Sequence, residues 1–251
     1  MQGLSEAQFE VGSCYLQGTG VEKDERWYRM AAEQGDVPAQ YSLGVMYAYG
    51  RGLQKDQVQA LVWLRRAAEK DYPLAQGAIG LALLNGDGVS KDEVAGVAWL
   101  RKAADRGNVD SQFNLAVCYD NGRGLPKDDS EAIVWYRKAA DQGLPGAQHS
   151  LGLKYHHGIG VAQNTTEAVE WFLKAADQMH APAQHSLGLS YLKGLGVPKD
   201  NALAYMWLNL SAGNGNEDAR DVRDKLDKLL SRSEIEAGQQ IGREWMAKHR
   251  K

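Results

Sequence analysis

Apolar residues recur along this chain at the spacing of an amphipathic helix. In segment 57–68 they fall at i, i+3, i+4, i+7 and i+8, a spacing that places them on one face of a helix. These residues are Ala60, Trp63, Leu64, Ala67 and Ala68. The segment is therefore predicted to be a helix with one buried side. Asp56 is its predicted N-cap, because the carboxylate can accept bonds from backbone N–H groups at the start of the helix.

A second helix is predicted just before this one, from about Pro38 to Tyr49. Proline is tolerated in the first helical turn, and glycine favours the left-handed conformation that follows the last turn. Gly50 therefore marks the end of the helix, and residues 50–53 form the turn to the next helix.

This helix pair repeats every 36 residues. Tryptophan recurs at that spacing at Trp27, Trp63, Trp99, Trp135, Trp171 and Trp207. The glycine that ends the first helix recurs at Gly50, Gly86, Gly122, Gly158 and Gly194. A single pair of short helices cannot cover its own apolar face, so neighbouring pairs must stack against one another. The repeat predicts an all-α solenoid of antiparallel helix pairs.

The repeat tryptophans are predicted to be core residues, because a ligand contact would have no reason to recur in six repeats. Burial of one indole contributes about 3 kcal/mol at roughly 25 cal/mol per Å². A Trp99→Ala change is therefore predicted to cost about 3–5 kcal/mol of stability.

Both ends of the chain depart from the repeat. Trp27 follows Asp24 by three residues, whereas Trp63 follows Asp56 by seven, so the first repeat is predicted to be four residues shorter. After the last repeat, two capping helices are predicted at 218–230 and 233–248. The domain prediction is a single solenoid over residues 1–251, with six repeats over about 4–217 and capping helices within 218–251.

Composition and charge narrow the function classes. The net charge of −3 gives no basic surplus for a nucleic-acid backbone, and 43% hydrophobic residues are enough for a real core. No apolar run approaches the roughly 20 residues that cross a bilayer, so no membrane span is expected. Two cysteines are too few for a disulfide framework. The compartment stays open: cytoplasmic for the chain as given, periplasmic or secreted if a signal peptide was removed.

The repeat also resembles a known family. The pattern A-Q-x-x-L-G-x-x-Y-x-x-G-x-G-V-x-K-D, followed by A-x-x-W-x-x-K-A-A-x-x-G, resembles the Sel-one-like repeat, a bacterial relative of the tetratricopeptide repeat. Departures occur at Leu83, Ala116, Gln163-Asn164 and Met179, and those around 163 and 179 suggest altered turns in the fifth repeat. The resemblance implies a right-handed superhelix that binds a partner protein or peptide in a concave groove. A monomer is slightly favoured over an oligomer.

The resemblance also implies which residues contact the partner, because the first helices of such repeats line the groove. By position, the predicted contact residues are Phe9, Tyr41, Tyr49, Phe113, His149, His157, His185 and Lys193. Gly77, Asn85 and Asn121 occupy matching positions. Aromatic rings suit a peptide-binding groove because they supply much contact area at small entropic cost. The alternative is that these rings only fill gaps between helices.

Histidine is concentrated between residues 149 and 185. The five residues are His149, His156, His157, His180 and His185. They can be read as partner contacts, as plain surface residues or as metal ligands. No carboxylate or thiolate lies at motif spacing beside them, so no metal site is expected. As partner contacts they would gain charge below about pH 6.5 and favour an acidic partner there.

No motif of a known enzyme class is present: HExxH, GxSxG and GxxxxGK[ST] are all missing. A cysteine–histidine arrangement of Cys118 with His149 can be imagined, but Cys118 occupies a site where other repeats carry small or apolar residues. The sequence therefore predicts a non-catalytic scaffold without a cofactor. The alternative is the binding of cell-wall-like small molecules or a weak hydrolase activity, as linked to some cysteine-rich relatives, whose paired cysteines this chain lacks.

Overall fold

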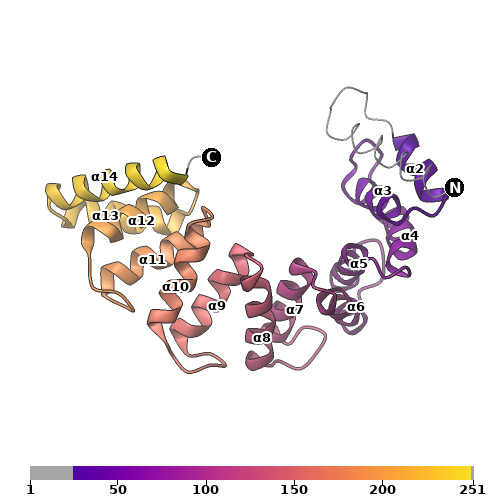
Figure 1. Ribbon diagram of the computed structural model, residues 1–251, viewed down its shortest axis with the longest axis horizontal. Helices are drawn as coiled ribbons and strands as arrows, with labels where there is room; N and C mark the ends of the chain where they lie inside the picture. Colours follow the sequence, from indigo (N-terminus) through magenta and orange to yellow (C-terminus); the bar gives the residue numbers. More distant parts are fainter. Residues whose placement is uncertain (1–24, 250–251) are drawn as a thin grey trace. The chain divides into compact units, whose positions relative to one another are not determined.

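The computed structural model describes residues 25–249, which form thirteen α-helices and no strand. The chain divides into two compact units, Met1–Lys127 and Asp128–Lys251. The described helices of the N-terminal unit are α2 (Glu25–Glu33), α3 (Val37–Tyr49), α4 (Gln57–Ala68), α5 (Pro73–Asn85), α6 (Glu93–Asp105) and α7 (Val109–Asn121). Those of the C-terminal unit are α8 (Asp129–Asp141), α9 (Pro145–His157), α10 (Thr165–Ala176), α11 (Ala181–Lys193), α12 (Asn201–Gly213), α13 (Glu217–Leu229) and α14 (Arg232–His249). Within each unit, successive helices of the repeats run antiparallel (Figure 1).

The predicted boundaries of the helix pair are confirmed. Helix α3 ends at Gly50, which is left-handed with φ 68° and donates its N–H to the Met46 carbonyl. Helix α4 begins after Asp56, whose carboxylate accepts bonds from the Val58 and Gln59 N–H groups at 3.0 Å each. Local punctuation in the sequence therefore fixes both ends of the turn between the two helices.

The altered turns expected in the fifth repeat are absent, so that expectation was wrong. Asn164 adopts φ −146° and accepts a bond from the Glu167 N–H, and Asp56 adopts nearly the same backbone at its own cap. Met179 takes the left-handed conformation with φ 62°, although four of the other repeats have glycine there. The packing of the repeat keeps the same turn at this position. The left-handed conformation is therefore strained at Met179, because methionine has a Cβ and glycine does not. Asp71 takes the same conformation, with φ 62°, which the sequence comparison missed.

The six repeat tryptophans, called the tryptophan ladder below, are buried at four of their six positions. Trp63 shows the arrangement: it forms one core cluster with Ala31 and Ala32 of α2 and with Ala39 and Leu43 of α3. Trp135, Trp171 and Trp207 are buried as well. Trp27 and Trp99 are only half-buried, so the prediction that every repeat tryptophan is a core residue needs correction. The indole of Trp99 packs at the edge of its cluster, and Lys102 Nζ lies 4.4 Å from its centroid.

The two closing helices occur within about one residue of their predicted bounds. Helix α14 packs on α12 through glycine: a Cβ at residue 238 would lie 2.6 Å from the Ala202 carbonyl oxygen. Trp245 lies edge-on to Trp207, with 5.4 Å between the ring centroids. The shortened segment of the first repeat falls partly before residue 25, outside the described residues. The single-domain assignment stays a prediction.

Candidate interaction groove

A missing side chain opens a pocket in the N-terminal unit. The helices α3, α5 and α7 are the first helices of their repeats. Their fifth residue is a large aromatic residue on α3 and α7, Tyr41 and Phe113, but on α5 it is Gly77. A Cβ at residue 77 would overlap Ser111 Oγ, so glycine allows α5 and α7 to approach closely. The row of large side chains is therefore interrupted between Tyr41 and Phe113.

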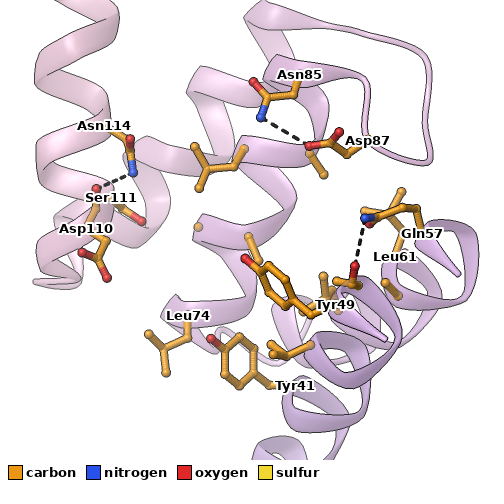
Figure 2. Close-up of a pocket in the computed structure, with 18 of the residues that line it drawn as sticks. Tyr41, Tyr49, Gln57, Leu61, Leu74, Asn85, Asp87, Asp110, Ser111 and Asn114 are labelled. Carbon is orange, nitrogen blue, oxygen red and sulfur yellow. Dashed lines mark hydrogen bonds between the residues drawn. The ribbon is translucent and has the colours of Figure 1, made fainter. Parts of the chain in front are cut away.

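The pocket at this interruption has a volume of about 630 Å³ and is lined by residues of α3, α4, α5, α7 and the turns beside them. Leu74 and Leu81 of α5 line it and remain 40% and 37% exposed. Tyr41 and Tyr49 line it from α3 (Figure 2). Exposed leucines beside tyrosine rings form an apolar surface that another polypeptide could cover.

Polar groups surround this apolar surface. The Asn85 amide donates to Asp87 Oδ2 at 3.3 Å, and the Asn114 amide donates to the Asp110 carbonyl at 2.8 Å (Figure 2). Across the pocket, the Gln57 amide donates to the Ala48 carbonyl at 3.1 Å. An apolar centre with a polar rim is the usual arrangement of a protein interface.

Burial and neighbouring groups shift the pKa of Tyr41, one of the tyrosines that line the pocket. Tyr41 and Tyr72 lie with 5.4 Å between their ring centroids. Burial raises the pKa of Tyr41 above its usual 10, and the nearby Tyr72, Tyr49 and Asp110 raise it further. The phenol of Tyr41 is therefore neutral at physiological pH, and the negative charge of Asp110 contributes to its raised pKa.

The structure brings only part of the predicted groove row together in the N-terminal unit. Tyr41 and Tyr49, with Gly77 and Asn85, line one pocket. Phe113 is half-buried and does not line it, and Phe9 lies outside the described residues. The sequence analysis missed the lining residues Leu74, Leu81, Asp110 and Asn114. The signal that could have found them is the glycine in the aromatic row, which leaves the side chains around it uncovered.

The predicted residues of the C-terminal unit form a different environment. His149 on α9 lies with its Nε2 3.0 Å from Ser186 Oγ on α11. Its ring centroid is 5.3 Å from that of His180 and 5.6 Å from that of Phe172. Because Ser186 Oγ donates to the Pro182 carbonyl, it accepts the proton of His149 Nε2. His149 is therefore a half-buried ring held between α9 and α11.

The other predicted C-terminal residues vary in exposure. His157 and Lys193 are exposed, and the His157 ring lies edge-on to His156 with 4.7 Å between centroids. His185 is half-buried, and no residue within 25–249 forms a hydrogen bond with its Nε2. Within residues 25–249, no three His, Cys, Asp or Glu side chains gather closely enough to hold a metal ion.

The histidines were expected to gain charge below about pH 6.5, but burial lowers the pKa of four of them. Desolvation, followed by the neighbouring His180 and His185, lowers the pKa of His149 to about 4. Burial also lowers the pKa of His156, His180 and His185. The low pKa of His149 keeps this ring neutral under the mildly acidic conditions in which it was expected to attract an acidic partner, and the pKa shifts of the other three rings have the same direction.

Cys118 has the properties of a core residue. Its side chain is buried, and burial raises its pKa above the usual 9. A thiol of this kind is a poor nucleophile at neutral pH, because the thiolate is the reactive species.

None of the described helices is both long and apolar enough to cross a membrane.

Comparison with known proteins identifies the repeat. A family model described as the Sel1 repeat matches residues 5–36, 37–72, 73–108, 109–144, 145–180 and 181–216. No curated protein matches significantly. Sel1 repeat proteins are generally non-catalytic scaffolds for protein–protein interactions.

Solved structures similar to this chain include proteins from three bacteria. A protective antigen of uropathogenic Escherichia coli strains, described as displaying an SLR fold, is 34% identical with a TM-score of 0.86; the match covers 99% of this chain and 54% of that one. The chain thus spans about half the length of this relative. A Sel1 repeat protein from Oxalobacter formigenes is 29% identical with a TM-score of 0.80, and the match covers 98% and 96% of the two chains.

The third is an immunity protein from Pseudomonas aeruginosa, 20% identical with a TM-score of 0.53 over 84% of this chain and 81% of that one; it shows a shared fold alone. The 36-residue helix pairs, the tryptophan ladder and the six matched repeats lead to one conclusion. The chain belongs to the Sel1 repeat family.

Proposed function

We propose that this protein is a non-catalytic scaffold that holds a partner polypeptide in the pocket around Gly77. The observation that carries the proposal is an open volume of about 630 Å³ with exposed leucines on one wall and tyrosines on the other. Large exposed apolar side chains grouped on one surface are typical of interaction sites. Tyr41 and Tyr49 are the proposed aromatic contacts.

The general role of the family supports this proposal, because Sel1 repeat proteins usually act by binding other proteins. Cys118 is buried and its pKa is raised, so it supplies no evident nucleophile. Phe113, His149, His157, His185 and Lys193 stay predicted contact residues. Among them, exposed His157 and Lys193 are better placed to meet a partner than half-buried His149.

Selection of short random peptides on the intact chain tests this function. The affinity of the selected peptides is then measured by fluorescence anisotropy for the unchanged protein and for Leu81→Glu. We expect Leu81→Glu to weaken binding by about tenfold or more, since a carboxylate on the apolar wall is desolvated when a peptide covers it.

Val58→Glu is the matched control, because Val58 is an exposed valine of the same unit, 60% exposed, that does not line the pocket. It should leave the affinity within about twofold, since surface changes away from an interface have small effects. Equal affinities for both variants would show that the peptides bind elsewhere and would refute the proposal.

A further inference from the structure

The charges around the pocket point to the chemistry of its partner. The lining carries two carboxylates, Asp87 and Asp110, against one ammonium group, Lys55. Neither carboxylate is ion-paired within the described residues, and Asp87 only accepts a bond from Asn85. By contrast, two other carboxylates of the same unit are ion-paired: Asp71 pairs with Arg106 at 2.6 Å, and Glu93 pairs with Arg123 at 3.1 Å.

Asp110 is not required by the repeat frame. It lies in the first turn of α7, where a carboxylate interacts favourably with the helix dipole. Yet α3, α5, α9 and α11, the first helices of other repeats, have no acidic residue in their first turns. The helices form without this charge, so its place beside the pocket needs another explanation.

The cationic side is at the other tyrosine. The Arg51 guanidinium lies 5.3 Å from the centroid of the Tyr49 ring, and Lys55 follows in the same turn. The ring of Tyr49 therefore already has a cation on its face. No cation lies over the Tyr41 ring within the described residues, and the Asp110 carboxylate lines the same pocket as Tyr41. Tyr41 is therefore the pocket tyrosine whose ring a cation of the partner could contact.

We infer that the partner segment inserts a lysine or arginine side chain between Leu74, Tyr41 and Asp110. This inference rests on the proposed function. The aliphatic stem of such a side chain covers the exposed leucine, its charge meets the Asp110 carboxylate, and the Tyr41 ring offers a cation–π contact. An acidic segment would be repelled, and a purely apolar one would desolvate the carboxylate without a partner.

The selected peptides provide the probe. We expect lysine or arginine to be enriched at one position next to apolar residues. Replacing that residue by norleucine, which keeps the stem and removes the charge, should weaken binding about tenfold, and Asp110→Asn should do the same to the unchanged peptide. The norleucine peptide should bind both proteins equally, because the two changes remove the same interaction.

Asp218→Asn is the matched control. Asp218 is the second residue of the closing helix α13, as Asp110 is of α7, and it is exposed, but it lies in the C-terminal unit. Both changes remove a first-turn carboxylate, so any loss of helix stability is shared, and the loss of peptide affinity is expected only for Asp110→Asn.

The outcomes separate the two proposals. Two results would overturn the inference but not the proposed function, provided that the peptides lose affinity for Leu81→Glu. One is that the selected peptides lack a basic residue. The other is that Asp110→Asn leaves their affinity unchanged. Peptides insensitive to Leu81→Glu overturn the proposed function, and the inference with it.

Discussion

The guanidinium of Arg137 on α8 lies 5.6 Å from the centroid of the Tyr155 ring on α9 and donates a hydrogen bond to the Tyr155 hydroxyl. Arg101 and Tyr119 make the same pair in the N-terminal unit, with 5.5 Å to the centroid. In each case the second helix of one repeat is tied to the first helix of the next. The pair adds a polar link to the stacking of apolar faces.

Leu83→Tyr is expected to supply this link where it is missing. Leu83 of α5 takes the place of the tyrosine, while Arg65 of α4 keeps the place of the arginine. Leu83 is buried, 8% exposed, and other repeats hold a tyrosine at this position, so the variant should gain about 0.5–1 kcal/mol from the cation–π contact. The free energy of unfolding in urea measures the gain. It should vanish in the Arg65→Gln background, and an equal gain in both backgrounds would show that the link is not its source.

Met179→Gly is expected to stabilise the protein. Met179 is left-handed with φ 62°, which costs a side chain with a Cβ about 1–2 kcal/mol. Glycine removes that strain but adds freedom to the unfolded chain, worth roughly 0.5–1 kcal/mol. The net gain is expected to be a few tenths of a kcal/mol up to about 1 kcal/mol, measured as a rise in Tm.

Asp71→Gly provides the contrast, because Asp71 has the same φ of 62° but makes bonds that Met179 lacks. Its carboxylate accepts from Gln76 Nε2 at 3.1 Å and pairs with Arg106 at 2.6 Å. Aspartate also tolerates this backbone better than methionine. We expect no gain from Asp71→Gly, and a gain equal to that of Met179→Gly would argue against strain as the cause.

The two kinds of repeat tryptophan should differ in their effect on stability. Trp135 is 4% exposed, so Trp135→Ala is expected to cost about 3–5 kcal/mol. Trp99 is half-buried and loses less contact on truncation, so Trp99→Ala should cost about half as much. Urea denaturation of the two variants measures the difference. Equal losses would mean that exposure does not govern the contribution of the indole.

Stability should fall as the pH drops from about 6.5 towards about 4. The pKa of His149 is about 4 in the folded chain and 6.5 without burial, so the unfolded chain binds more protons in this window. Its contribution is therefore complete above pH 6.5 and is lost as the pH falls to about 4. Tm measured across this range should fall less steeply for His149→Gln than for the unchanged chain. An equally steep fall for His149→Gln and for the unchanged chain would show that His149 is not the source of the pH dependence.

Helix boundaries could be predicted from the sequence because their signals are local. Asp56 caps α4 and Gly50 ends α3 through bonds to residues a few positions away. The exposure of Trp99 and the neutral state of His149 could not be predicted, because both depend on side chains from neighbouring repeats. The left-handed Asp71 was overlooked because aspartate is common in turns, so the residue alone does not indicate strain.

The candidate site was predicted only in part for a related reason. Tyr41 and Tyr49 could be named from their repeat position. The pocket itself results from the absence of a side chain at Gly77 and from the spacing of α3, α5 and α7 around it. Exposed Leu74 and Leu81 look like ordinary helix residues until the gap beside them is seen.

Hydrogen–deuterium exchange of the intact chain, with and without a selected peptide, tests the central claim most directly. We predict slower amide exchange in α3, α5 and the first turn of α7 when the peptide is bound, because these segments line the pocket. Slower exchange elsewhere, with α3, α5 and α7 unchanged, would contradict the proposal that the partner binds in this groove.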